Sequence, residues 1–178
     1  AEGEALIRAA KAPVIVAGGG VIYSGAEAAL GEFASRHDIP VIETQAGKSS
    51  LAQAHPMNYG AAGVDGSAAA NAQAGKADLI LGIGTRLQDF TTGSRTLFPQ
   101  AKLVSINVQP YDAAKHGGVS LVADARVALE KLGAALGDYR AKGADPAARA
   151  EWLAAVDAHC AAPAEGNQLP TDAQVIGA

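Results

Sequence analysis

The sequence is poor in cysteine, in aromatic residues and in net charge. Its 178 residues include one Cys, one Met, one Trp, four Tyr and three Phe, and the formal net charge is −4. A single thiol forms no internal disulfide and no cysteine-based zinc site, so we expect Cys160 to be a small apolar packing residue. The weakly acidic balance gives nucleic acid no broad electrostatic attraction, which disfavours a DNA- or RNA-binding role.

Long apolar runs and metal-binding spacings are also missing. No run approaches the roughly 20 residues that cross a bilayer, and no basic start followed by an apolar stretch suggests a signal peptide. We therefore expect no membrane contact and a cytoplasmic location. The histidines show neither H-x-x-x-H nor H-E-x-x-H spacing, so we predict no metal site. They are His37, His55, His116 and His159.

What the sequence does have is an alternation of short aliphatic runs with Ala-rich stretches, the pattern of βαβ units and a parallel sheet. Several of the runs are apolar at consecutive positions, which is typical of strands covered by helices on both faces. We predict a doubly wound, Rossmann-like α/β fold with a mostly parallel sheet of five or six strands. The five runs are Val14–Ala17, Val41–Thr44, Leu79–Ile83, Leu103–Val108 and Ser120–Val122.

Helix signals lie between and after these runs. Ser24 and Glu27 match an S-x-x-E capping box, so we expect the first helix after the glycines to begin there, with Leu30 and Phe33 on its buried face. Asp145 and Pro146 are typical of the N-cap and first residue of a last helix. We place one domain at residues 1–161. The aperiodic, proline-containing segment that follows predicts a linker at residues 162–178.

The run "APVIVAGGGVIYSGAE" places three glycines between a strand and a helix. Gly18 and Gly20 fill the first two positions of the G-x-G-x-x-G dinucleotide fingerprint, but Tyr23 occupies the third. Three interpretations remain open: an NAD site, a tight turn with no ligand, and a related nucleotide or flavin phosphate site. In the last, the backbone N–H groups of Gly19 and Gly20 would face an anion.

Two other segments carry binding signals. "GKSS" imitates the end of a P-loop, but Ile42 stands where its first glycine is needed, so we predict no P-loop and expect Lys48 to be a solvated loop residue. "LILGIGTRLQDF" places Arg86 directly after a buried strand, where ligands bind in open α/β sheets. A guanidinium there suits a phosphate or a stacked ring, and the alternative is an ion pair with Asp89.

Six segments in order carry a family resemblance between Ala9 and Leu132. They are "APVIVAGGGV", "IPVIETQAGKSS", "HPMNYGAAG", "KADLILGIGTRLQDFTTGS", "AKLVSINVQP" and "VSLVADARVAL". Together they resemble the central domain of thiamine-diphosphate-dependent enzymes such as acetohydroxyacid synthase and pyruvate oxidase. "ETQAGKSS" and "GIGTRLQDFTTGS" are most similar to the trihydroxycyclohexanedione hydrolases of myo-inositol breakdown.

The resemblance implies a three-domain parent enzyme. An N-terminal domain would supply a catalytic glutamate, and a C-terminal domain would bind the cofactor's diphosphate through Mg²⁺, so this chain would hold no catalytic and no metal-binding residue. Residues 162–178 would lead to that last domain. The partners implied are the flanking domains of the same chain and further copies in a homo-oligomer.

Some relatives hold FAD or an adenine nucleotide in this domain. FAD-binding members often carry acidic residues where this chain has Asn107, so we expect FAD to be disfavoured. The ligand-contacting positions implied by the resemblance are Gly19, Gly20, Gln45, Gly47, Gly60, Thr85, Arg86, Gln88, Asn107 and Asp124.

Two functional hypotheses follow. In the first, the chain is a non-catalytic domain of an enzyme that opens a cyclic 1,2-diketone by thiamine-dependent C–C hydrolysis. In the second, it is a nucleotide-binding module, either free-standing or of the acetohydroxyacid synthase type, with its ligand near Gly20, Arg86 and Asn107. A free-standing NAD-dependent dehydrogenase would need a fuller glycine fingerprint.

Overall fold

The structure, a computed structural model, describes residues 1–161, apart from the side chains of His159 and Ala161. By compactness the chain divides into a first unit, Ala1–Ala144, and a second unit that begins at Asp145. The second unit contains α8 (Pro146–Ala161), whose N-terminus is capped as expected, because the Ala148 N–H donates to Asp145 Oδ1 at 3.1 Å. We expected this helix within the first domain. The expected linker lies outside the described residues.

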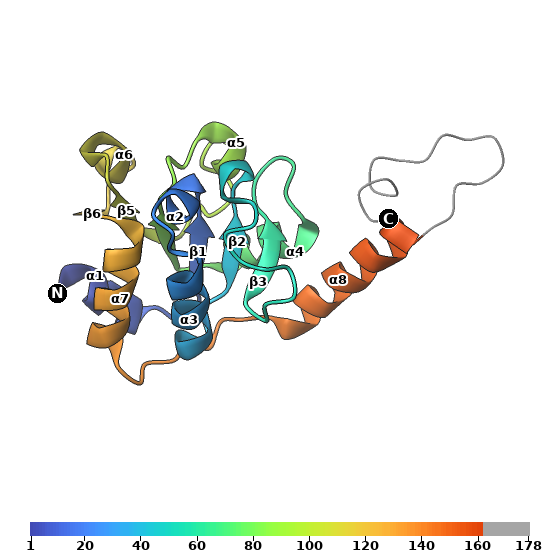
Figure 1. Ribbon diagram of the computed structural model, residues 1–178. Helices are drawn as coiled ribbons and strands as arrows, with labels where there is room; N and C mark the ends of the chain where they lie inside the picture. Colours follow the sequence, from blue (N-terminus) through green and yellow to red (C-terminus); the bar gives the residue numbers. More distant parts are fainter. Residues whose placement is uncertain (162–178) are drawn as a thin grey trace. The chain divides into compact units, whose positions relative to one another are not determined.

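The first unit is built on a six-stranded, fully parallel sheet (Figure 1), which confirms the predicted fold class. The strand order is β3-β2-β1-β4-β5-β6. Strands β2 and β3 therefore extend the sheet on one side of β1, and β4, β5 and β6 extend it on the other side. The strands are β1 (Pro13–Ala17), β2 (Val41–Glu43), β3 (Asn58–Ala61), β4 (Leu79–Ile83), β5 (Lys102–Asn107) and β6 (Val119–Val122). The order reverses between β1 and β4, which is where ligands bind in such sheets.

Helices cover both faces of this sheet. The helical elements of the first unit are α1 (Glu2–Ala9), α2 (Gly19–Tyr23), α3 (Glu27–His37), the short 3₁₀ turn η1 (Gln45–Gly47), α4 (Ala68–Lys76), α5 (Asp89–Thr92), α6 (Pro110–Ala114) and α7 (Ala125–Leu136). Helices α3 and α7 lie side by side across one face (Figure 1). No helix among residues 1–161 is long and apolar enough to span a membrane.

Two apolar clusters, one on each face, explain why the strands lack polar alternation. In β1, Ile15 packs with Leu30 and Phe33 in one cluster, whereas Val14 and Val16 belong to the other cluster. A fully buried Ile or Leu contributes about 1.5–3 kcal/mol to the free energy of unfolding. The sheet is therefore an internal layer, and its carboxyl-end loops are the parts free to form a site.

The start of α3 differs from the sequence-based prediction. Ala26 is the N-cap, and no side chain caps the helix. The Ser24 hydroxyl instead donates to the Gly20 carbonyl of the preceding helix at 2.8 Å. The predicted capping box is wrong because a separate short helix, α2, occupies the segment before α3 and takes Ser24 as its own C-terminal residue. Leu30 and Phe33 are buried, as expected.

A close backbone approach joins the turns after β1 and β4. The Gly20 N–H donates to the Gly84 carbonyl at 2.9 Å, and a Cβ on Gly20 would lie 2.6 Å from the Gly84 Cα. Gly84 also has a φ of +58°, a conformation that L side chains rarely adopt. Only glycine at both positions allows the two turns to meet.

We predict that Gly20→Ala destabilises the fold by about 1–3 kcal/mol, because its methyl group would overlap backbone atoms that cannot rotate away. Gly75→Ala is the matched control. Gly75 is also helical but exposed, and the nearest atom would lie 3.8 Å from a methyl group added there, so alanine should stabilise the helix by about 1 kcal/mol. Urea unfolding of both variants measures the difference. Equal effects would show that the two turns do not meet closely.

Alkaline pH should also test the packing of Tyr139. Burial is the main cause that raises the pKa of Tyr139 above its ordinary value, the Asp78 charge adds to it, and Arg8 opposes it. Above pH about 10 the unfolded chain therefore loses this proton before the folded chain does, and the free energy of unfolding falls as pH rises toward the folded-state pKa.

Tyr139→Phe should remove that part of the alkaline loss, and unfolding in urea between about pH 9 and pH 11 measures it. Tyr111→Phe is the control, since Tyr111 is 76% exposed. An identical pH profile for wild type and Tyr139→Phe would contradict the prediction.

Candidate functional site

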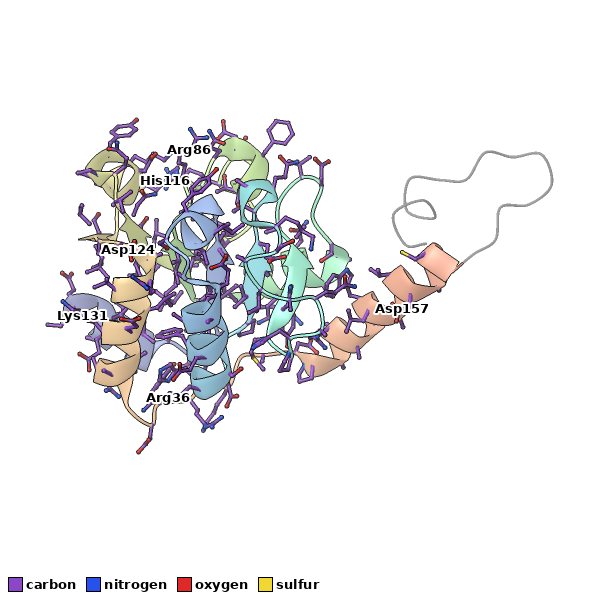
Figure 2. All side chains as sticks on the ribbon, in the orientation of Figure 1. Arg36, Arg86, His116, Asp124, Lys131 and Asp157 are labelled. Carbon is purple, nitrogen blue, oxygen red and sulfur yellow. The ribbon has the colours of Figure 1, made fainter. Side chains whose placement is uncertain are left out.

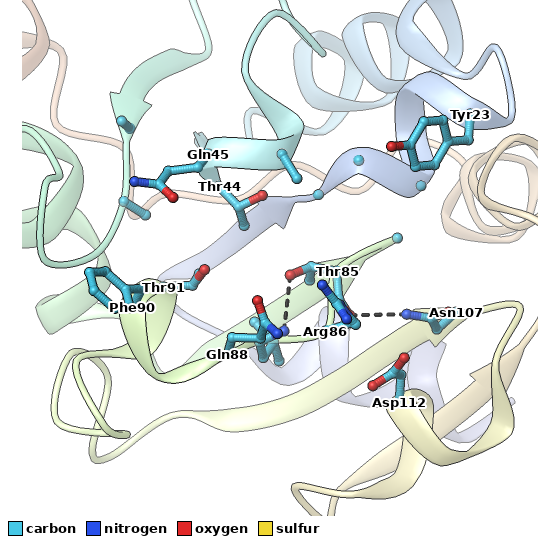
Figure 3. A pocket seen from close by; sticks show the side chains of 18 of the residues that line it. Tyr23, Thr44, Gln45, Thr85, Arg86, Gln88, Phe90, Thr91, Asn107 and Asp112 are labelled. Atoms are coloured by element: carbon cyan, nitrogen blue, oxygen red, sulfur yellow. Dashed lines mark hydrogen bonds between the residues drawn. The ribbon is translucent and has the colours of Figure 1, made fainter.

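A cleft of about 400 Å³ lies at the carboxyl ends of the strands, over the point where the strand order reverses. Figure 3 shows its two walls: Tyr23 and Gln45 come from the β1–β2 side, and Arg86, Gln88 and Asp112 come from the β4–β5 side. Figure 2 places Arg86 at this end of the fold, with His116 near it. The size is within the range of small-molecule sites, about 300–1,000 Å³.

Seven of the ten predicted site residues meet in this cleft. They are Gly19, Gly20, Gln45, Thr85, Arg86, Gln88 and Asn107. The other three do not line it. Gly47 is buried beneath the cleft, Gly60 lies within β3, and Asp124 caps α7, where it accepts the Val127 N–H at 3.2 Å and borders a smaller neighbouring recess. The role of the seven in ligand binding stays a prediction.

The turn after β4 is held tightly beneath the cleft. The Thr85 hydroxyl accepts the Leu87 N–H at 3.1 Å, and His116 Nε2 lies 2.8 Å from the Leu87 carbonyl, which requires this ring nitrogen to carry the proton. Leu87 is buried and has a φ of +45°, a backbone conformation that costs a residue other than glycine about 1–3 kcal/mol. Such a conformation persists only where the surrounding contacts hold the residue in place. Sequence analysis assigned His116 no such role.

This turn leaves Arg86 exposed at the cleft. Among the ion pairs of the described residues, none involves Arg86, so the alternative of a pair with Asp89 is not seen. The guanidinium is therefore available to a ligand.

Asn107 is used within the fold. Its Nδ2 donates to the Thr85 carbonyl at 3.1 Å, and its Oδ1 accepts the Gln109 N–H at 3.0 Å. The side chain thus ties the end of β5 to the turn after β4. Each end of the amide keeps one further hydrogen-bonding position, and the expectation that FAD is disfavoured stays a prediction.

The glycine turn after β1 is also committed to the fold. The Gly20 N–H donates to the Gly84 carbonyl at 2.9 Å, so it does not face an anion, and that part of the phosphate-site interpretation is wrong. On the opposite side of this turn, a Cβ on Gly47 would collide with the Ala17 carbonyl oxygen. A Cβ on Gly18 or on Gly20 would overlap the Gly84 backbone, so these two glycines are required by close packing, whereas an anion contact of the Gly19 N–H stays a prediction.

Glu43 ends β2 as a fully buried carboxylate. Its Oε1 accepts the Ser50 hydroxyl at 3.2 Å and the Leu51 N–H at 3.0 Å, which fixes the loop that carries Gln45. Its Oε2 has no hydrogen bond among the described residues and lies 3.7 Å from the ammonium of Lys48, whose side chain is 61% exposed. Lys48 is thus a solvated loop residue, as expected, with a weak ion pair.

Sequence analysis missed several lining residues. Tyr23 and Phe90 are exposed aromatic residues at the cleft, and Asp65 and Asp112 add two carboxylates. Asp65 Oδ2 accepts a hydrogen bond from Gln45 Nε2 at 3.2 Å, and Asp112 pairs with Lys115 at 3.1 Å. Tyr23 and Phe90 stand within segments that the sequence analysis singled out for other residues, and no pattern marked any of the four as a lining residue.

The described residues contain no group of three or more His, Cys, Asp or Glu side chains that could hold a metal ion. Mg²⁺ on a diphosphate is usually held by one or two carboxylates together with the phosphates and water, so this finding concerns only metal sites built from protein side chains alone.

Comparisons with known proteins agree with this architecture. In Geobacillus thermodenitrificans, a 3D-(3,5/4)-trihydroxycyclohexane-1,2-dione hydrolase is 51% identical over 134 residues, which are 75% of this chain and 21% of that protein. In Bacillus subtilis, a protein of the same name is 44% identical over 153 residues, 84% of this chain and 24% of that protein. The chain thus spans about a fifth to a quarter of the length of these relatives.

A solved structure is similar as well. A candidate thiamin diphosphate-dependent enzyme from Mycobacterium smegmatis superposes with a TM-score of 0.61 and 27% identity, over 75% of this chain and 26% of that one. The sequence pattern of the family described as thiamine pyrophosphate enzyme, central domain, matches residues 4–132, which include all six strands and most of α7. The chain belongs to the family of central domains of thiamine pyrophosphate enzymes.

Proposed function

We propose that the chain is the central domain of an enzyme that hydrolyses a C–C bond of a cyclic 1,2-diketone such as trihydroxycyclohexane-1,2-dione. The observation that carries this proposal is the 51% identity to a protein named for that reaction, which extends over 134 residues. Identity of this level over 75% of the chain is a stronger argument than the fold, since one fold hosts many functions.

The proposal places the reaction outside this chain. Thiamine diphosphate and Mg²⁺ would bind to other domains of the parent enzyme, since the chain matches only the central domain of this family and spans 21% of the relative from Geobacillus thermodenitrificans. Thiamine diphosphate supplies the electron sink for C–C cleavage when bound. Glu43 is a poor candidate for a catalytic glutamate, since it is fully buried and its Oε1 is already bonded to Ser50 and Leu51.

The central domain would then act as a rigid body between flanking domains. Its two apolar clusters give it a core of its own, and exposed aliphatic and aromatic side chains such as Val108 and Tyr111 remain for contacts with other domains or copies. Assembly into a homo-oligomer, the use of Mg²⁺ and the cytoplasmic location stay predictions.

An activity measurement on two proteins tests the proposal. An intact protein that contains this chain should open the diketone ring when supplied with thiamine diphosphate and Mg²⁺. The 178-residue chain should show no turnover, and a circular dichroism spectrum typical of a folded α/β protein should confirm that this is not caused by unfolding. Ring opening by the chain alone, or an intact enzyme inactive on this diketone, would contradict the proposal.

A Glu43→Gln substitution in the intact protein adds a sharper control. Because Glu43 supports a loop and takes no part in the reaction, kcat per folded molecule should stay within about threefold of wild type, whereas loss of a general acid–base group costs about 10²–10⁴. A fall of that size in a folded variant would place Glu43 in the chemistry.

A further inference from the structure

The two edge strands of the sheet differ in how well their edges are protected. Strand β3 is irregular, because its register against β2 shifts and the Gly60 N–H donates to the Asn58 side chain at 2.8 Å. Strand β6 lies at the other end of the sheet (Figure 1) and keeps an unbroken register with β5. Its sequence, "VSLV", contains no proline and no charged residue. Bulges, prolines and charges keep edge strands from pairing with other chains, so β6 is open to such pairing.

The backbone groups of Ser120 and Val122 point away from the sheet. The Ala123 N–H donates to the Asn107 carbonyl of β5 at 3.2 Å, so Ala123 faces inward. Because successive residues of a strand direct their backbone groups to opposite sides, Leu121 also faces β5, whereas Ser120 and Val122 face outward. Within residues 1–161, no hydrogen bond uses the outward N–H and C=O groups of these two exposed residues.

Small residues leave room beside this edge. Gly117 and Gly118 precede β6, and no atom beyond the chain neighbours lies within 4 Å of a Cβ added at Gly117. Val122, the last residue of β6, is 57% exposed, and Val108, which directly follows β5, is 66% exposed. A strand that pairs with β6 would therefore gain apolar contacts in addition to backbone hydrogen bonds.

A second copy of this chain fits the edge. In a two-fold contact the same patch meets itself, so a charged side chain there would face its own copy and repel it. No residue from Gly117 to Ala123 carries a charge. Ser120 and Val122 both face outward and are two positions apart, so each can form a hydrogen-bonded pair with the other residue of an antiparallel copy. A partner recognised through charge would find none on this edge.

We propose that two copies of this chain associate through β6, antiparallel to each other, about a two-fold axis at Leu121. Ser120 of one copy then pairs with the partner's Val122, and Leu121 lies opposite its own copy. The two six-stranded sheets join into one continuous sheet. The proposal does not depend on which reaction the intact protein catalyses.

Sedimentation equilibrium of the 178-residue chain tests the association. We expect the mass to rise from 17.8 kDa toward twice that value as the protein concentration is raised to about 1 mM, which populates even weak complexes. A mass that stays at 17.8 kDa over this range would overturn the proposal.

A proline on the edge tests the role of the backbone. Ser120→Pro removes an outward N–H and no bond between β6 and β5, so the monomer should keep its fold. The Kd for self-association should rise about 10-fold or more, because the two-fold axis makes one substitution remove two hydrogen bonds. Ser120→Ala is the matched control: it also loses the hydroxyl bond to the Ala113 carbonyl, but it keeps the N–H and should associate like wild type. Equal Kd values for two folded variants would contradict the pairing.

A pair of lysine substitutions tests the location without touching the backbone. Val122→Lys places like charges at both ends of the paired segment and should abolish the association. Val64→Lys is the control, because Val64 is 64% exposed but follows β3, at the other end of the sheet. Both side chains are exposed, so both variants should fold, as circular dichroism can check. If Val122→Lys still associates, or if Val64→Lys dissociates the dimer equally, the contact lies elsewhere and the proposal is wrong.

Discussion

The backbone contact between Gly20 and Gly84 is the constraint on which the site depends. It joins the turns of β1 and β4 at the point where the strand order reverses, and it leaves no room for a side chain at either glycine. The turn after β4 is then fixed further by Thr85, Asn107 and His116. Arg86 is presented at the cleft because the backbone on both sides of it is held.

The same contact also bears on whether the glycine-rich segment can bind a phosphate. In a dinucleotide site the turn N–H groups remain open to a pyrophosphate. Here Gly20 donates to protein, and Asn107 is bonded at both ends of its amide. The cleft lies at the place expected for an α/β sheet, but its lining has mixed charge and exposed aromatic rings. The fold determines the position of the cleft, and individual side chains determine which ligand it could bind.

The fold could be predicted from the sequence because the central strands are apolar on consecutive positions, and the five predicted runs correspond to β1, β2, β4, β5 and β6. Strand β3 was missed because "NYGA" is short and contains Asn58, whose side chain donates to the Leu51 carbonyl at 2.9 Å and so replaces apolar burial with a specific bond. The predicted capping box was wrong because a local sequence pattern cannot show that Ser24 is the C-cap of α2, two residues before the N-cap of α3.

The site was predictable in part, for a physical reason. Residues directly after strands, such as Arg86 and Gln88, reach the cleft because parallel strands end at one edge of the sheet. Tyr23, Asp65 and Phe90 reach it through the courses of their helices and loops, which depend on tertiary packing. Gly47 and Gly60 were assigned to a ligand, but neither lines the cleft: a Cβ on Gly47 would collide with the Ala17 backbone, and the Gly60 N–H donates to the Asn58 side chain.

Hydrogen exchange at the Gly20 amide tests the central claim most directly. If the Gly20 N–H is bonded to the Gly84 carbonyl, it should exchange as slowly as the Ile15 amide of β1, which is bonded to the Pro40 carbonyl at 2.8 Å. Addition of phosphate should not change that rate. Rapid exchange at Gly20 that phosphate slows would contradict the account, because the turn would then be open and able to bind an anion.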